Sequence, residues 1–128
     1  MIWADNGYGK MVSRRQGNHN PRVKALPEKG LKNRCHGVYY HVSFYDLQAA
    51  NVLTMIPNSM EFVEKELKNA YECGIQNLWL INCSNIKPHV YPLDFIAALW
   101  NGEEGGEKAH LTRYIRRYYA GIPDSRCV

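Results

Sequence analysis

The segment from Gly37 to Phe44 constrains the fold most, because its pattern is that of a buried strand. Its residues, Gly-Val-Tyr-Tyr-His-Val-Ser-Phe, are mostly aromatic or β-branched and do not alternate between apolar and polar side chains. This pattern favours a strand buried on both faces, as in parallel sheets. Ligand sites in parallel α/β folds lie outside the carboxyl ends of the strands. We therefore expect His41, near the downstream end, to lie where binding or chemistry takes place.

A helix and another strand follow, and with the first strand they predict a βαβ unit. Asn58 or Ser59 is expected to cap the helix, and Gly74 supplies a stop signal. An apolar run from Leu78 to Ile81 then predicts a strand within residues 75–83. Strands joined in this way are parallel. Asn82 is thus expected at the same edge of the sheet as His41, where both side chains could face one pocket.

The remaining elements complete a single α/β segment over residues 1–128, a length typical of one domain. Residues 1–4 predict a short strand that enters the turn-rich sequence Asp5-Asn6-Gly7-Tyr8-Gly9. Residues 10–36 are expected to form a basic loop and 122–128 a tail. Further helices are expected from Pro92 to Trp100 and from about Glu107 to Ala120. The abrupt start at a strand suggests that the chain is a fragment of a larger domain. No apolar run in the sequence approaches the ~20 residues that a membrane-spanning helix needs.

The positive charge is concentrated in the loop. Between residues 10 and 34 there are eight Lys or Arg and one acid, Glu28, although the formal net charge of the whole chain is only +4. Such a segment could contact phosphates or an acidic saccharide. A solvated loop whose cations meet acids elsewhere in a larger assembly is the favoured interpretation. A nucleic-acid-binding module is the alternative, although the sequence contains no recognition helix, zinc finger or aromatic strand motif.

The cysteines do not indicate a disulfide framework or a standard metal site. The four cysteines form no CxxC pair. A zinc site can be drawn, but the spacings of its ligands match no standard pattern; the ligands would be Cys35, His36, Cys83 and His89. We therefore predict neither a metal nor a cofactor.

Three motifs in register resemble glycoside hydrolase family 115, the xylan α-1,2-glucuronidases, whose catalytic (β/α)₈ barrel lies inside a larger chain. They are Trp3-Ala4-Asp5-Asn6-Gly7-Tyr8-Gly9, Gly37-Val38-Tyr39-Tyr40-His41-Val42-Ser43, and Leu78-Trp79-Leu80-Ile81-Asn82 followed by Ile86-Lys87-Pro88. The resemblance implies part of a TIM-type barrel with three parallel strands and flanking helices, and a glucuronosyl-substituted saccharide as ligand. It implies Asp5 and His41 as catalytic residues. The substrate-binding residues that it implies are Asn6, Tyr8, Tyr40, Asn82 and Lys87.

At two positions where the family pattern usually has an aspartate, this chain has an asparagine, so fewer carboxyl groups are available for catalysis. The family usually has two consecutive aspartates where this chain has Asp5-Asn6, and an aspartate before Ile-Lys-Pro where this chain has Asn85. An amide can hydrogen-bond hydroxyls but cannot exchange a proton as a carboxyl group does. Glycoside hydrolysis generally needs two carboxyl groups. We therefore expect a fragment or degenerate relative that is inactive alone and pairs with the remaining half of the barrel or with another copy. A structural α/β piece without a ligand is the further alternative.

Overall fold

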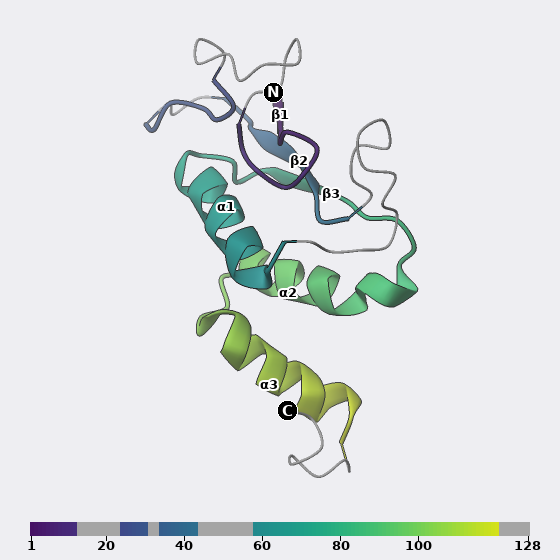
Figure 1. Cartoon of the computed structure of the whole chain (residues 1–128). Coiled ribbons are helices and arrows are strands. Elements are labelled where there is room, and N and C mark those ends of the chain that lie inside the picture. The colour runs from purple at the N-terminus through teal and green to yellow at the C-terminus, as the bar shows by residue number, and fades with distance from the viewer. Residues whose placement is uncertain (13–23, 31–33, 44–57, 121–128) are drawn as a thin grey trace.

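The computed structural model describes residues 1–12, 24–30, 34–43 and 58–120 (Figure 1). It contains the predicted order of elements. The strands are β1 (Ile2–Ala4), β2 (Gly37–His41) and β3 (Leu78–Asn82), and the α-helices are α1 (Met60–Glu72), α2 (Val90–Trp100) and α3 (Gly106–Tyr118), with a short 3₁₀ helix η2 (Lys87–His89) before α2. None of the described helices is both long and apolar enough to cross a membrane.

The strands form one parallel sheet in the order β1-β2-β3, which confirms the three parallel strands expected from the sequence. Ala4, Tyr39 and Leu80 lie side by side across the sheet. Two residues further along, His41 pairs with Asn82 at the carboxyl ends of β2 and β3. Because side chains at matched positions point to the same face of a parallel sheet, this register places His41 beside Asn82.

Helices α1 and α2 cover one face of this sheet. Val38 and Tyr40 of β2 are fully buried and belong to the same hydrophobic core as Leu67 of α1 and Phe95 of α2. Trp79 of β3 packs against the edge of this core. Residues two apart on a strand share a face, so the helix-covered face carries the even-numbered side chains of β2.

The opposite face carries Tyr39, His41 and Asn82, and it is more open in the described part of the chain. Ile2, Leu78 and Leu80 have exposed fractions of 59%, 47% and 50%. The expectation that the strand from Gly37 to Phe44 is buried on both faces is confirmed in part for the described part of β2, where Gly37, Val38 and Tyr40 are buried and Tyr39 and His41 are half-buried. The pattern overstates the burial of Tyr39 and His41, because a side chain's hydrophobicity does not show whether a neighbouring element covers it.

The ends of α1 follow the sequence signals. Ser59 is the N-cap, and its Oγ accepts a hydrogen bond from the backbone N–H of Phe62 at 3.2 Å. Gly74 follows the C-cap in the left-handed conformation at a φ of 101°. Helix α3 packs against α1 and α2 and lies beyond α2 on the side away from the strands (Figure 1).

Candidate active site

The turn after β1 is organised by the side chain of Asp5, which is fully buried. Its Oδ1 accepts a hydrogen bond from the backbone N–H of Gly7 at 3.1 Å. Its Oδ2 accepts from the backbone N–H groups of Gly9 at 2.6 Å and His41 at 3.2 Å. Gly7 and Gly9 have φ values of 83° and 80°, which glycine adopts without a steric penalty. The Asp-Asn-Gly-Tyr-Gly sequence thus wraps backbone donors around one carboxylate.

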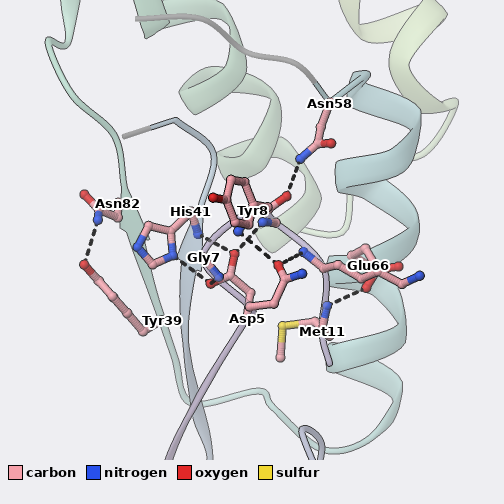
Figure 2. A network of polar contacts seen from close by, with 12 residues as sticks. Asp5, Gly7, Tyr8, Met11, Tyr39, His41, Asn58, Glu66 and Asn82 are labelled. Atoms are coloured by element: carbon pink, nitrogen blue, oxygen red, sulfur yellow. Dashed lines mark hydrogen bonds and ion pairs between the residues drawn. The ribbon is translucent and has the colours of Figure 1, made fainter. Parts of the chain in front are cut away.

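Asp5 also holds the ring of His41. The Nδ1 of His41 lies 2.7 Å from Asp5 Oδ1, as Figure 2 shows. An ionised carboxylate only accepts hydrogen bonds, so this pairing places a proton on Nδ1 and leaves Nε2 as the nitrogen that can accept or donate a proton. The His41 side chain is 16% exposed, so the ring is partly accessible. The pair joins two strand ends that are distant in sequence.

Tyr39 and Asn82 lie on the other side of His41. The Nδ2 of Asn82 donates a hydrogen bond to the hydroxyl of Tyr39 at 2.7 Å. The Tyr39 and His41 rings meet edge to face with their centroids 4.8 Å apart. Phenol, imidazole, carboxylate and amide groups from three strand ends therefore form one continuous set (Figure 2). Such a set can bind sugar hydroxyl groups, which both donate and accept hydrogen bonds.

Asn6 and Tyr8, expected to bind substrate, help to shape the turn beside this set. The Oδ1 of Asn6 accepts from the backbone N–H groups of Tyr8 at 3.0 Å and Lys10 at 3.2 Å. The carbonyl oxygen of Tyr8 accepts from Asn58 Nδ2 at 2.6 Å. Glu66 of α1 accepts from the backbone N–H of Met11 at 2.8 Å and so fixes the end of the turn (Figure 2).

Tyr40 and Lys87 are not among the residues that gather around His41. Tyr40 is fully buried in the core under α1 and α2, which does not fit the substrate contact expected for it. The physical reason is the pleat, since adjacent residues on a strand point to opposite faces. Lys87 is exposed in η2, beyond the end of β3. Sequence reasoning missed Tyr39, although its spacing of two residues from His41 indicates that both side chains share a face.

No group of three or more His, Cys, Asp or Glu side chains is arranged to hold a metal ion in the described segments. Two residues of the zinc site that can be drawn from the sequence have other partners. His36 accepts a hydrogen bond from Trp3 Nε1 at 3.0 Å, and buried His89 has Nδ1 2.6 Å from the carbonyl oxygen of Asn85.

Much of the basic loop, residues 13–23 and 31–33, lies outside the described residues. In the described part, Lys24 pairs with Glu28, and Lys29 lies 3.6 Å from Glu72. These two cations of the loop thus meet acids of the same chain, whereas the favoured interpretation placed the acids in a larger assembly. The two pairs give no support to the nucleic-acid alternative.

Comparisons with known proteins identify the family. Among solved structures, the chain resembles a family GH115 4-O-methyl-α-glucuronidase with specificity for decorated arabinogalactans, with a TM-score of 0.65 and 28% sequence identity. The match covers 91% of this chain but only 14% of that enzyme, so the chain spans a small part of its length. No curated protein matches. The sequence profile of glycosyl hydrolase family 115 matches residues 1–126. The chain therefore belongs to glycosyl hydrolase family 115.

Proposed function

We propose that this chain forms one wall of a glucuronosyl-binding site and does not hydrolyse a glycoside alone. The observation that carries the proposal is the Asp5–His41 pair beside Tyr39 and Asn82, at the carboxyl end of the open face of a parallel sheet. In parallel α/β folds this edge is where ligands bind. The family match favours a polysaccharide decorated with glucuronosyl groups as the substrate class.

The hydrogen bonds suggest separate roles for Asp5 and His41. Both oxygens of Asp5 already accept two hydrogen bonds each, from Gly7 and the His41 ring and from Gly9 and the His41 backbone. Taking a proton from a substrate would require one of these oxygens to give up a contact that it makes in the structure. Asp5 therefore acts as a positioning residue that sets the tautomer and orientation of His41. His41 Nε2 is then the group that meets the substrate, where it binds a sugar hydroxyl or moves a proton.

The described site lacks the second carboxyl group that glycoside hydrolysis generally requires. Glu66, the other acid in the network around Asp5, holds the backbone of Met11. Asn6 and Asn85 are amides at the positions where the family usually has aspartates. A carboxyl group from another part of the enzyme would have to complete the reaction. This supports binding without turnover by the isolated chain.

The sheet also supports the proposal that the chain is a segment of a (β/α)₈ barrel. Its strands are parallel and adjacent in the order in which they occur along the chain, as in such barrels. The helices α1 and α2 cover one face, and the site residues lie on the other. The remaining part of the barrel, or a second copy of this chain, would cover that other face. The polysaccharide could be a xylan, as the resemblance implies, or an arabinogalactan, as for the similar enzyme.

An NMR titration tests the proposed site and compares the two polysaccharides. The ¹⁵N-labelled chain is titrated with glucuronosyl-xylose or glucuronosyl-galactose oligosaccharides. We expect the amide signals of Gly7, His41 and Asn82 to shift. Replacing Tyr39 by Phe removes the hydroxyl that holds Asn82 and should weaken binding by about fivefold, the worth of roughly one hydrogen bond.

Tyr71→Phe is the matched control, because Tyr71 is an exposed tyrosine on α1 with the same hydroxyl to lose. It should leave the affinity unchanged. Saccharide-induced shifts that avoid residues 5–9, 39–41 and 82 would overturn the proposed site. Release of glucuronic acid by the isolated chain would overturn the claim that it binds without turnover.

A further inference from the structure

We propose that the hollow between α2 and α3 is a second saccharide-binding site, for the neutral part of a polysaccharide chain. It encloses about 120 Å³. Its lining comes from α2, the turn after it, and α3, and it consists of Asp94, Ala97, Ala98, Asn101, Glu103, His110, Arg113, Tyr114 and Arg117. It shares none of the residues around His41. The proposal depends on the proposed function only for the choice of a polysaccharide as ligand.

The lining of the hollow includes a buried histidine, His110, whose ring nitrogens make no hydrogen bond of suitable geometry with the described residues. His110 is 5% exposed. Its Nε2 lies 3.0 Å from Asp94 Oδ2 but off the direction of a hydrogen bond, and Nδ1 has no hydrogen-bond partner within the described part of the chain. The ring is held by contacts with the Phe95 and Tyr91 rings, at centroid distances of 5.2 and 5.8 Å. A buried polar atom without a partner is costly, so a ligand hydroxyl that reaches this ring would gain a hydrogen bond.

The charges around His110 favour a neutral ligand. Arg113 Nη2 lies 3.1 Å from Glu103 Oε2, and Arg117 Nη1 lies 3.7 Å from Asp94 Oδ1. Two guanidinium groups and two carboxylates thus balance, and an anion would have to compete with both acids. Neighbouring hydroxyl groups on a sugar offer donors to carboxylates and acceptors to guanidinium groups, so they can use both kinds of charged group at once.

Exposed tyrosine rings lie beside these polar groups on α3. The Tyr114 ring lies in the hollow, with its centroid 4.6 Å from that of Tyr118 and 6.5 Å from that of Tyr119. Tyr118 and Tyr119 are 53% and 50% exposed. Aromatic faces provide apolar contact area to the C–H groups of a sugar ring, with a hydroxyl at the edge for hydrogen bonding. A few convergent polar groups beside aromatic side chains are typical of small-molecule sites.

The test is an NMR titration of the ¹⁵N-labelled 128-residue chain with an arabinogalactan oligosaccharide from which the glucuronosyl groups have been removed. We expect the signals of residues 101–103 and 110–118 to shift. Arg117→Ala and Tyr118→Ala should each weaken this binding about five- to tenfold. Arg116→Ala is the matched control. It makes the same change in size and charge at another exposed arginine of the same helix, but Arg116 does not line the hollow, so binding should be unchanged.

Three results would overturn the proposal. One is equal weakening by Arg116→Ala and Arg117→Ala, which would indicate a non-specific charge effect. Another is a set of shifts confined to residues 5–9, 39–41 and 82, which would place this ligand at the first site. The third is a dimer in sedimentation velocity that Tyr118→Ala dissociates, with no saccharide-induced shifts, which would make the hollow an interface between copies. His41→Gln should leave the α3 shifts intact, so failure at either site can be recognised separately.

Discussion

Replacing Asp5 by Ala should destabilise the chain more than any other single change in the turn after β1. The substitution removes a fully buried carboxylate and leaves the backbone N–H groups of Gly7, Gly9 and His41 and the Nδ1 of His41 without their acceptor. Hydrogen bonds to a charged group contribute about 1.5–3 kcal/mol each, but the glycine-rich turn can relax and admit water after the change. Each buried donor that is left without its acceptor costs about 1–3 kcal/mol. We therefore expect a loss of about 3–5 kcal/mol, a large part of the ~5–15 kcal/mol that stabilises a typical domain.

Asn6→Ala is the matched control for this experiment. Asn6 is the next residue in the same turn, and its Oδ1 also accepts from two backbone N–H groups, those of Tyr8 and Lys10. It is neutral and only half-buried, so its loss should cost about 1 kcal/mol. Asp5→Asn keeps one acceptor oxygen and should fall between the two, which leaves a measurable variant if Asp5→Ala does not fold.

Urea unfolding followed by far-UV circular dichroism gives the free energy of unfolding of all three variants and the parent chain. The expected order of stability is parent, Asn6→Ala, Asp5→Asn, Asp5→Ala. A loss in Asp5→Ala no larger than that in Asn6→Ala would refute the reasoning. It would mean that the carboxylate does not hold the turn and His41 in place.

Two further predictions concern other parts of the structure. Gly9→Ala should lose about 1–3 kcal/mol more stability than Gly30→Ala in urea unfolding. Both glycines have positive φ values, but a Cβ at Gly9 would lie 2.7 Å from Asn58 Nδ2, whereas a Cβ at Gly30 would meet no described atom within 4 Å. Equal losses of stability would show that the structure around Gly9 shifts to accommodate the added Cβ. Burial, then the hydrogen bond to Glu107 and the charge of Glu107, raise the pKa of Tyr91 above the ~10 of a tyrosine in a model peptide. Tyr91 should therefore stay protonated in the folded chain above about pH 10. The stability that this shift contributes is present below about pH 10 and is lost as the pH rises further. The pKa of Tyr91, followed by ultraviolet absorbance, should be lower in Glu107→Gln than in the parent but still above the ~10 of an ordinary tyrosine, because burial is the largest cause and remains. Identical titration curves would contradict a contribution from Glu107.

The helices and strands could be predicted because the start and end of each depend on residues close to it in the sequence. Ser59 caps α1 through its own hydroxyl, and Gly74 ends the helix through a conformation that glycine adopts readily. The parallel arrangement of β2 and β3 followed from the chirality and length of the connection between them. These features depend on a few neighbouring residues or on connectivity, and both can be read from a sequence.

The site could be predicted only in part, because side-chain direction depends on register. The positions of His41 and Asn82 at strand ends were predictable, whereas the choice between Tyr39 and Tyr40 required the strand's burial pattern, in which Tyr40 faces the helices. The pairing of Asp5 with His41 joins residues 36 positions apart, and no local pattern indicates a contact of that kind. The exposure of Leu80 could not be predicted either, because an apolar run of sequence does not show which face of the strand another element covers.

Both carboxylate oxygens of Asp5 already accept hydrogen bonds that hold the fold, and this limits the chemistry that Asp5 can perform. Family members usually have two aspartates in the turn where this chain has Asp5-Asn6, and here the aspartate that remains uses both oxygens to hold backbone N–H groups and the His41 ring. A carboxylate cannot fill that structural role and also exchange protons with a substrate without breaking the contacts that position His41. Asn6 also accepts two hydrogen bonds from the backbone of the turn, but as an amide it supplies no carboxyl group for proton transfer. A chain of this kind should retain the shape of a saccharide site and depend on a carboxyl group from elsewhere for hydrolysis.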